Sequence, residues 1–155
     1  MESFAYYDTD LGLLEVGCTG ETVTHLRWVD ESVHPHAPTA LSDEAANQVQ
    51  RYLAGERQDF DLPLAPAGTD FQRSVWQALC AIPYGQTRTY GDIACAIGRP
   101  TAARAVGAAA GRNPIWIVIP CHRCVGKDGA LTGYAGGLWR KEKLLALEKS
   151  LLTER

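Results

Sequence analysis

Three short stretches near the start of the chain carry the alternating or clustered apolar side chains that are typical of β-strands: Phe4–Tyr7, Leu13–Cys18 and Val23–Trp28. The turn-forming segments Asp10-Leu11-Gly12 and Thr19-Gly20-Glu21 separate them. Strands that are joined by such short turns pair in antiparallel order. The pattern therefore predicts an antiparallel meander.

The spacing of apolar residues then changes to that of a helix, from about Ser42 to Leu53. The segment 60–64 is predicted to be an edge strand, because it contains a proline. A Pro- and Gly-rich stretch, residues 65–68, follows it. We expect the domain boundary there, with a supporting domain at residues 1–67 and a second domain at residues 68–155.

The second domain opens with two helix-start signals. Thr69 and Gln72 form a capping box, in which each side chain bonds the other residue's backbone N–H, and Thr89 and Asp92 form another. The first box begins a helix to about Ala81, with core positions at Phe71, Val75, Leu79 and Ile82. The second box begins a short helix to Gly98. A third helix is predicted from Thr101 to about Gly111, so these last two form a helix-turn-helix pattern.

The third helix consists almost entirely of alanine and glycine, and Arg104 is its one long side chain. Such a helix can pack tightly in a core. It can also bring its backbone close to a nucleic-acid groove and present a single guanidinium as a wedge. The lone cation favours the second interpretation.

The run Ile115–Ile119 is β-branched and aromatic, and it is predicted to be a buried strand that ends just before Cys121. A thiol held in this way is a candidate nucleophile. The alternative is a small buried hydrophobic residue, which is the usual role of an unpaired cysteine.

Charge divides unevenly along the chain. Residues 1–67 hold three basic and twelve acidic residues, a net charge of -9, and residues 68–155 hold twelve basic and six acidic residues, a net charge of +6. A cationic half is typical of a domain that meets a polyanion such as nucleic acid, although a solvated basic surface is the alternative.

Five cysteines, an odd number, are scattered through apolar contexts, which indicates reduced thiols in a reducing compartment. No apolar run approaches the roughly 18 residues that a membrane span needs, and the first residues carry no leader pattern. We expect a soluble protein of the cytoplasm or nucleoid with no membrane partner.

Several motifs, in order, resemble the O6-alkylguanine-DNA alkyltransferases, which move an alkyl group from damaged guanine onto their own cysteine. The resemblance covers residues 69–148 densely: Tyr84-Gly85, Thr89-Tyr90, Ala102-Ala103-Arg104-Ala105-Val106-Gly107, Gly111-Arg112-Asn113-Pro114, Pro120-Cys121-His122-Arg123 and Tyr134-Ala135-Gly136-Gly137, with Leu144 and Glu148. Over residues 1–67 it is only architectural. It implies an α/β (α+β) protein with a ribonuclease H-like first domain and a winged helix-turn-helix second domain that binds DNA and transfers the alkyl group.

The resemblance also implies roles for individual residues. Cys121 would accept the alkyl group, and His122 and Glu148 would activate it through a water. Tyr90 would donate a hydrogen bond to the leaving guanine and press on the 3' phosphate, and Asn113 would pin the turn before the active-site segment. The substrate pocket would involve Trp116, Cys124, Tyr134 and Ala135. In the pocket, the Ala135 amide would face the alkylated oxygen, and the Cys121 and Cys124 carbonyls would accept from the exocyclic amine.

On the DNA side, Arg104 would replace the extruded base from the minor groove. Thr101, Ala102, Ala103 and Arg123 would contact DNA with it. The substrate would be double-stranded DNA containing O6-alkylguanine, and also O4-alkylthymine. Each molecule would react once, without a cofactor, because a thioether has no easy route to hydrolysis. We expect a monomer in solution that can bind DNA cooperatively.

Two departures from the family pattern lie near the nucleophile. Cys124 stands where an aliphatic residue is usual, and Trp116 stands where a smaller residue or proline is common. We expect Trp116 to narrow the pocket. Cys121 and Cys124 also form a C-x-x-C motif, which leaves a thiol-disulfide oxidoreductase as an alternative. A helix-turn-helix damage sensor or regulator without chemistry is another.

Zinc is a further possibility that the first domain raises, because some relatives bind it and this domain holds Cys18, His25, His34 and His36. Their spacing fits no compact zinc module, and histidines in loops are the commoner explanation. We expect no metal site.

Overall fold

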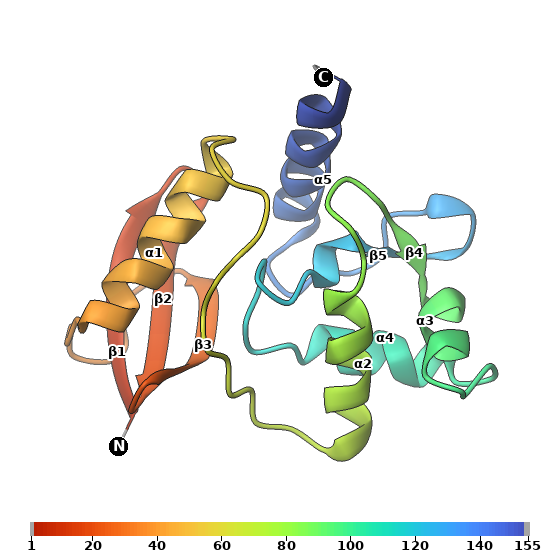
Figure 1. Cartoon of the computed structure of the whole chain (residues 1–155), viewed down its shortest axis with the longest axis horizontal. Coiled ribbons are helices and arrows are strands. Elements are labelled where there is room, and N and C mark those ends of the chain that lie inside the picture. The colour runs from red at the N-terminus through yellow and green to blue at the C-terminus, as the bar shows by residue number, and fades with distance from the viewer. Residues whose placement is uncertain (1, 154–155) are drawn as a thin grey trace. The chain divides into compact units, whose positions relative to one another are not determined.

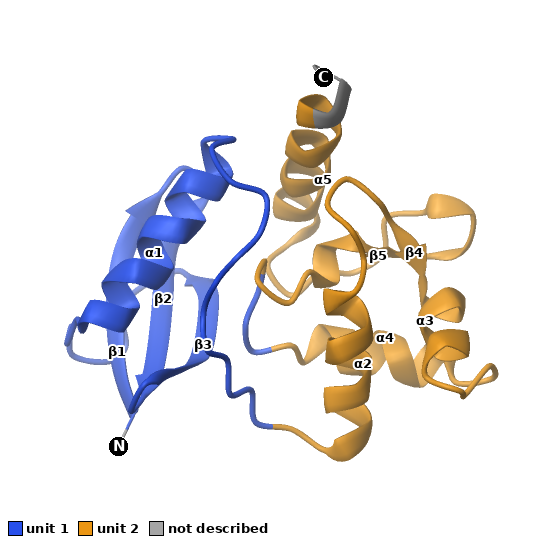
Figure 2. Ribbon diagram, viewed as in Figure 1, with its two compact units in different colours: residues 1–67, 114–116 blue, residues 68–113, 117–155 orange. Residues whose placement is uncertain are grey.

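The computed structural model describes residues 2–153, and by its contacts the chain divides into two compact units. Unit 1 comprises residues 1–67 and 114–116, and unit 2 comprises residues 68–113 and 117–155 (Figure 2). The short segment 114–116 therefore belongs to unit 1, although it follows the boundary that was expected at residues 65–68.

Unit 1 is a three-stranded antiparallel sheet in the order β1-β2-β3, with one helix (Figure 1). The elements are β1 (Glu2–Thr9), β2 (Gly12–Thr19), β3 (Thr22–Val29) and α1 (Ala40–Leu53). The predicted meander is confirmed, and each strand is longer than its apolar stretch. A two-residue turn joins β2 to β3, and Gly20 provides the positive φ of 60° that such turns need.

The core of unit 1 lies between the sheet and α1. The fully buried side chains include Leu14 and Val16 from β2, Leu26 from β3, and Val49 and Tyr52 from α1. The helix begins at a capping box in which Thr39 and Ser42 bond each other's backbone N–H groups. Burial of this apolar stripe fixes α1 against the sheet.

Unit 2 is built mainly from helices: α2 (Asp70–Cys80), α3 (Tyr90–Ala96), α4 (Ala103–Gly111) and α5 (Leu138–Thr153). Two-residue strands β4 (Arg88–Thr89) and β5 (Cys124–Val125) pair in parallel, and short 3-10 helices η1 (Cys121–Arg123) and η2 (Lys127–Gly129) flank β5. Both predicted capping boxes are present, at Thr69 with Gln72 and at Thr89 with Asp92. They explain where α2 and α3 begin.

Helices α2, α3 and α4 pack against one another around an apolar core. Its fully or nearly fully buried members are Val75, Leu79, Ile82, Ile93 and Val106. The side chain of Trp76 ties two of these helices together, because its Nε1 donates to the Ala109 carbonyl oxygen at 2.9 Å. This packing holds α4 with one face inward and one face outward.

Two predicted strands are wrong. In Ile115–Ile119 only Ile115 forms a bridge, with Leu26, and the chain then turns, with Ile117 at a φ of 70°. All three of its isoleucines are buried although only Ile115 pairs with a strand, so the apolar content of this run reflects burial rather than strand pairing. In the segment 60–64 only Leu64 pairs, with Val23. Proline cannot donate to a ladder, so Pro63 limits pairing within the segment 60–64, and Pro114 and Pro120 limit it on either side of the run 115–119.

The third predicted helix begins two residues later than expected, at Ala103, so Thr101 and Ala102 precede it. The Ala102 cap offers no side-chain hydrogen bond to the helix start. The last helix, α5, was not predicted, since its apolar residues show little one-sided periodicity.

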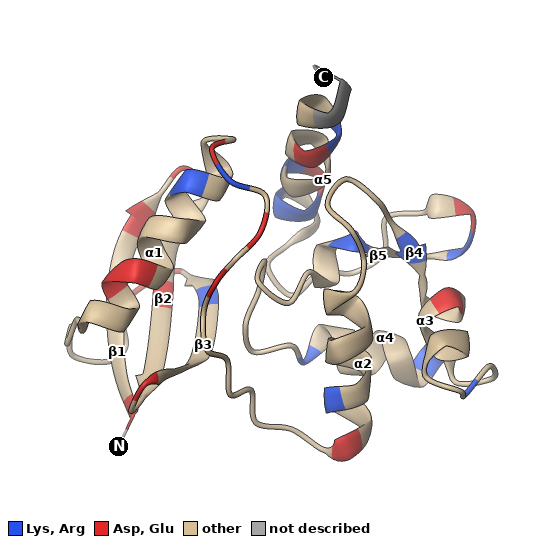
Figure 3. Cartoon of the chain, viewed as in Figure 1, with Lys and Arg blue, Asp and Glu red and all other residues tan. Residues whose placement is uncertain are grey.

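Acidic residues are prominent along the ribbon of unit 1, and lysine and arginine are distributed over the elements of unit 2 (Figure 3). Among residues 2–153, no helix combines the length and the apolar character that crossing a bilayer requires.

Candidate active site

A cavity of about 490 Å³ lies in unit 2 between α4 and the segment 132–135. It brings together six of the residues that the sequence singled out: Tyr90, Ala103, Arg104, Cys121, Tyr134 and Ala135. The remaining lining residues are Gly107, Ala110, Gly111, Thr132 and Gly133. Small side chains on α4 leave this space open, and the thiol of Cys121 faces it.

Helix α4 presents two different faces. Val106, Ala109 and Ala110 are buried, whereas Arg104 and Ala105 are exposed. Within residues 2–153, the Arg104 guanidinium has no ion-pair partner. The outer face of α4 therefore carries small side chains, and Arg104, which forms no ion pair with the described residues, lies at the cavity.

Cys121 begins the 3-10 helix η1 directly after Pro120, and its side chain is 6% exposed. Asn113 holds this segment from the end of α4. Its Nδ2 donates to the Ile119 carbonyl oxygen at 2.8 Å and to the Cys121 Sγ at 3.2 Å. The predicted pinning role of Asn113 thus has a geometric basis, and the contact with the nucleophile's own sulfur is an addition to it.

Burial raises the pKa of the Cys121 thiol to about 11, while Asn113, the Lys141 ammonium and Tyr134 lower that pKa. Burial also raises the pKa of Tyr134 well above its ordinary range. At neutral pH the thiol is therefore protonated. A reaction at the sulfur requires a group that takes the proton as the new bond forms.

His122 follows Cys121 in the chain, is fully buried and is not among the residues that line the cavity. Its Nε2 is 2.7 Å from the Glu148 Oε2, and its Nδ1 has no hydrogen-bond partner among the described residues. Burial lowers the pKa of His122, with Arg123 adding to this effect and Glu148 opposing it. The imidazole is therefore neutral at pH 7, with Nε2–H directed at the carboxylate and the lone pair on Nδ1.

The Glu148 carboxylate receives hydrogen bonds from four directions. Its Oε1 accepts from the Gly85 backbone N–H at 3.0 Å and from the Arg123 Nε at 2.9 Å. Its Oε2 accepts from a terminal guanidinium nitrogen of Arg123 at 2.9 Å, besides facing His122. A buried carboxylate needs such compensation, and here it is complete.

The expected DNA contact of Arg123 is wrong. Its side chain is buried, and its donors bond Glu148 twice and the Ile82 carbonyl oxygen once, at 2.8 Å. The guanidinium neutralises the carboxylate that orients His122. Arg123 is therefore a positioning residue of the buried cluster.

Neither Trp116 nor Cys124, which were expected in the substrate pocket, is among the residues that line this cavity. Trp116 belongs to unit 1, where its ring centroid lies 6.2 Å from that of Trp28. Cys124 is fully buried, and its carbonyl oxygen accepts from the Lys141 Nζ at 2.7 Å. The Cys121 carbonyl oxygen accepts from the Cys124 N–H. Each carbonyl therefore has one lone pair left for a ligand.

Replacing Trp116 by alanine should consequently affect stability and leave alkyl specificity alone. Loss of a buried indole costs about 3–5 kcal/mol of unfolding free energy. We expect urea unfolding to show that loss, and the ratio of the rates with O6-benzylguanine and O6-methylguanine to stay within about twofold of the wild-type ratio. A changed ratio with unchanged stability would return Trp116 to the pocket wall.

Sequence reasoning missed two residues at this site. Lys141 is fully buried, and its Nζ bonds the carbonyl oxygens of Cys124 and Thr132, at 2.7 and 3.2 Å. Thr132 lines the cavity and bonds Tyr90. A lysine on a helix ordinarily faces solvent, and Thr132 is itself an exposed loop residue, so the sequence carried no signal for either.

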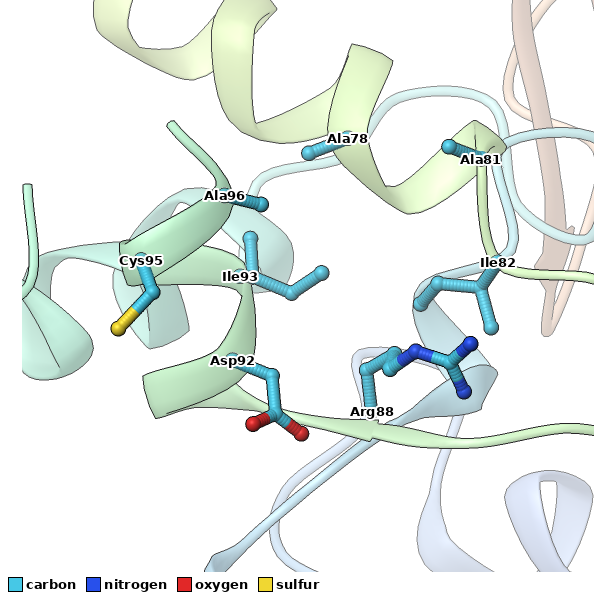
Figure 4. A pocket seen from close by; sticks show the side chains of 8 residues that line it. All are labelled: Ala78, Ala81, Ile82, Arg88, Asp92, Ile93, Cys95 and Ala96. Atoms are coloured by element: carbon cyan, nitrogen blue, oxygen red, sulfur yellow. The ribbon is translucent and has the colours of Figure 1, made fainter. Parts of the chain in front are cut away.

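A second hollow in unit 2, of about 450 Å³, lies between α2 and α3, and Cys95 is one of its lining residues (Figure 4). Its charged side chains already have local roles. Arg88 donates to the Thr87 carbonyl oxygen and to Gln86, and the Asp92 carboxylate caps α3. No histidine lines this hollow, so it lacks the base that accompanies Cys121.

Within residues 2–153, the five cysteines are unpaired, and no cluster of three or more His, Cys, Asp or Glu side chains could hold a metal ion. The C-x-x-C pair spans η1 and β5 rather than the start of a long helix. In unit 1, the His36 Nδ1 accepts from the Tyr6 N–H, and His25 faces Glu2 at 2.7 Å. These histidines serve structural contacts.

Family models match most of the chain. The model described as "6-O-methylguanine DNA methyltransferase, DNA binding domain" matches residues 70–150. The model described as "6-O-methylguanine DNA methyltransferase, ribonuclease-like domain" matches residues 3–66.

Individual proteins are similar over most of the chain. The methylated-DNA–protein-cysteine methyltransferase of Mycobacterium tuberculosis is 50% identical over 149 residues, which cover 92% of this chain and 90% of that protein. The protein of the same name from Methanosarcina barkeri is 63% identical over 109 residues, which cover 70% of this chain and 69% of that protein. The crystal structure of the M. tuberculosis O6-methylguanine methyltransferase superimposes with a TM-score of 0.89 at 46% identity, covering 97% of this chain and 94% of the other. A structure of the M. tuberculosis protein in complex with DNA gives a TM-score of 0.89 at 47% identity, covering 96% and 93%.

Proposed function

This chain belongs to the 6-O-methylguanine DNA methyltransferase family, and we propose that it repairs alkylated DNA directly by moving the alkyl group from O6 of guanine to the Sγ of Cys121. One observation carries the choice of residue. The Cys121 thiol faces a cavity beneath α4, and a neutral, carboxylate-oriented histidine adjoins it in the chain.

The reaction forms one bond and breaks one. The Sγ of Cys121 attacks the alkyl carbon, an S–C bond forms, and the bond between that carbon and O6 of guanine breaks. The thiol proton passes to the Nδ1 of His122 through a bridging water, since no direct contact joins the two side chains among the described residues. The guanine leaves with the electron pair of the broken C–O bond, and it takes up a proton to become neutral guanine.

Tyr90 would assist departure of the guanine. Its hydroxyl lies at the cavity, where it can donate a hydrogen bond to the base as negative charge develops there. Burial raises the pKa of Tyr90, which keeps the phenol protonated and able to donate. The Ala135 amide and the Tyr134 ring would form the wall beside the alkylated oxygen.

DNA would meet the outer face of α4. Small side chains let the helix backbone approach a groove, and Arg104 would occupy the space that the flipped nucleotide vacates. The DNA backbone would be contacted by residues at the start of that helix, namely Thr101, Ala102 and Ala103. The net charge of +6 on residues 68–155 supports a binding constant that falls steeply with salt.

The product explains why each molecule would act once. An S-alkyl thioether offers no leaving group that water displaces easily, and the proposed reaction uses no cofactor. The substrate would be duplex DNA with O6-alkylguanine, and O4-alkylthymine as well. We propose a monomer that can bind DNA cooperatively. Free thiols and a genomic substrate favour the cytoplasm as its place of action.

Replacing Arg104 by alanine should separate base extrusion from chemistry. Unstacking a base costs a few kcal/mol, which the guanidinium would offset, so we expect repair in duplex DNA to fall by about 100-fold. Reaction with free O6-benzylguanine should stay within about threefold of wild type. Lys143→Ala, which removes an exposed cation from α5, is the control and should affect both substrates little.

Equal losses of Arg104→Ala on both substrates would reject the wedge role.

The repair function itself is tested on the DNA. Duplexes that carry O6-methylguanine within a restriction site should become cleavable by the restriction enzyme after incubation with excess protein. No added cofactor should be needed for this repair. Duplexes that stay resistant to cleavage would contradict the proposed function.

A further inference from the structure

A hydrogen bond crosses the cavity that holds Cys121. The hydroxyl of Tyr90, at the start of α3, lies 2.9 Å from the Oγ1 of Thr132, in the segment between β5 and α5. Both residues line the cavity. The bond joins two segments that lie 42 residues apart in the chain.

The position of Thr132 is fixed on three sides. Its carbonyl oxygen accepts from the buried Lys141 Nζ at 3.2 Å. Its Cγ2 would lie only 2.9 Å from a Cβ at residue 126, so that methyl group fits because residue 126 is a glycine. Its Oγ1 then points at Tyr90. Thr132 is an exposed residue, so these contacts, rather than burial, favour one direction for its hydroxyl.

The Tyr90 ring has a neighbour of its own on α4. A Cβ at Gly107 on α4 would lie 3.8 Å from two ring carbons, an ordinary van der Waals distance. The ring therefore lies against α4, while its hydroxyl meets Thr132. Tyr90 enters the proposed reaction through that hydroxyl, so its direction matters.

We propose that Thr132 is a positioning residue for alkyl transfer. Its hydroxyl donates a hydrogen bond to the Tyr90 oxygen, and this bond directs the Tyr90 O–H at the leaving guanine. This inference rests on the proposed function. A phenol has one hydrogen to donate, and when Tyr90 gives it to the base, its oxygen accepts from Thr132. Hydrogen bonds in such a chain strengthen one another, so a Tyr90 that accepts a bond is also the better donor.

The hydroxyl and the methyl group of Thr132 can be tested separately. Thr132→Val removes the hydroxyl and keeps the shape, whereas Thr132→Ser keeps the hydroxyl and removes the methyl group. With O6-methylguanine duplex and excess protein, we expect Thr132→Val to lower the first-order transfer rate by about tenfold, the equivalent of one hydrogen bond. Duplex affinity should stay within about twofold, and Thr132→Ser should recover the rate to within about threefold.

The dependence on Tyr90 decides between positioning and a general structural effect. In a Tyr90→Phe background, adding Thr132→Val should cost no further rate, because the partner hydroxyl is already absent. Alkylation of Cys121 by iodoacetamide, which has no guanine leaving group, should proceed equally in wild type and Thr132→Val. Thr87→Val, at an exposed threonine that does not line the cavity, is the matched control.

Two results would overturn the inference: a Thr132→Val rate within about twofold of wild type, or the same tenfold loss in the Tyr90→Phe background. In either case wild-type protein would still repair the duplex, so the proposed function would stand. Wild-type protein that fails to transfer the methyl group at all would reject the proposed function and this inference together.

Discussion

Replacing Cys121 by serine should abolish alkyl transfer while the protein remains folded and bound to DNA. A serine hydroxyl is a far weaker nucleophile toward carbon than sulfur, and it is not ionised at neutral pH. The substitution keeps a small polar side chain that Asn113 can still contact. We expect no methyl group on the protein after prolonged incubation with O6-methylguanine duplex, and a DNA affinity within several-fold of wild type.

Two other cysteines provide controls for this result. Cys95→Ser alters an exposed thiol at the second hollow and should transfer at the wild-type rate. Cys124→Val removes the second thiol of the C-x-x-C motif and should retain transfer, because the proposed reaction needs one sulfur. Loss of transfer in Cys124→Val with an intact fold would favour the thiol-disulfide alternative, and full transfer in Cys121→Ser would assign the acceptor elsewhere.

Glu148→Gln should lower both stability and the transfer rate. The substitution leaves the Arg123 guanidinium buried without its counter-charge, and breaking a buried pair in this way costs about 3–5 kcal/mol of unfolding free energy. It also removes the carboxylate that orients His122. Because general base catalysis is worth roughly 10²–10⁴-fold, transfer should fall by about 100-fold where the variant is still folded.

Glu142→Gln tests whether this effect belongs to the buried site. Glu142 lies on the same helix, α5, and is exposed, so its substitution should change stability by less than about 0.5 kcal/mol. Urea unfolding measures the first quantity and rapid-quench transfer assays measure the second. A Glu148→Gln variant that is as stable and as fast as Glu142→Gln would show that the buried cluster is not essential.

Local signals predicted the parts of the fold that depend on neighbours in the chain. Both capping boxes lie where the sequence placed them, since a cap needs only residues three positions apart. The meander follows from its turns in the same way. The prediction of a strand at 115–119 was wrong, because β-branched residues indicate burial as well as strand pairing. The prolines that flank this run also limit the hydrogen bonds of a ladder.

At the site, the family resemblance supplied Cys121, His122, Glu148, Asn113, Tyr90 and Arg104, and the structure gives each a geometry from which its role can be argued. Long-range contacts decided the rest. Arg123 is turned inward by a carboxylate 25 positions away, and Trp116 lies beside Trp28 in the other unit. Pairings at that sequence separation leave no periodic signal, so one sequence cannot reveal them.

The most direct test of the central claim is the mass of the wild-type protein after reaction. Incubation with a large excess of O6-methylguanine duplex should add one methyl group per molecule, and peptide mapping should place it on the sulfur of Cys121. The amount of repaired guanine should equal the amount of modified protein. Many repaired guanines per protein molecule, or a methyl group on any other residue, would contradict the account.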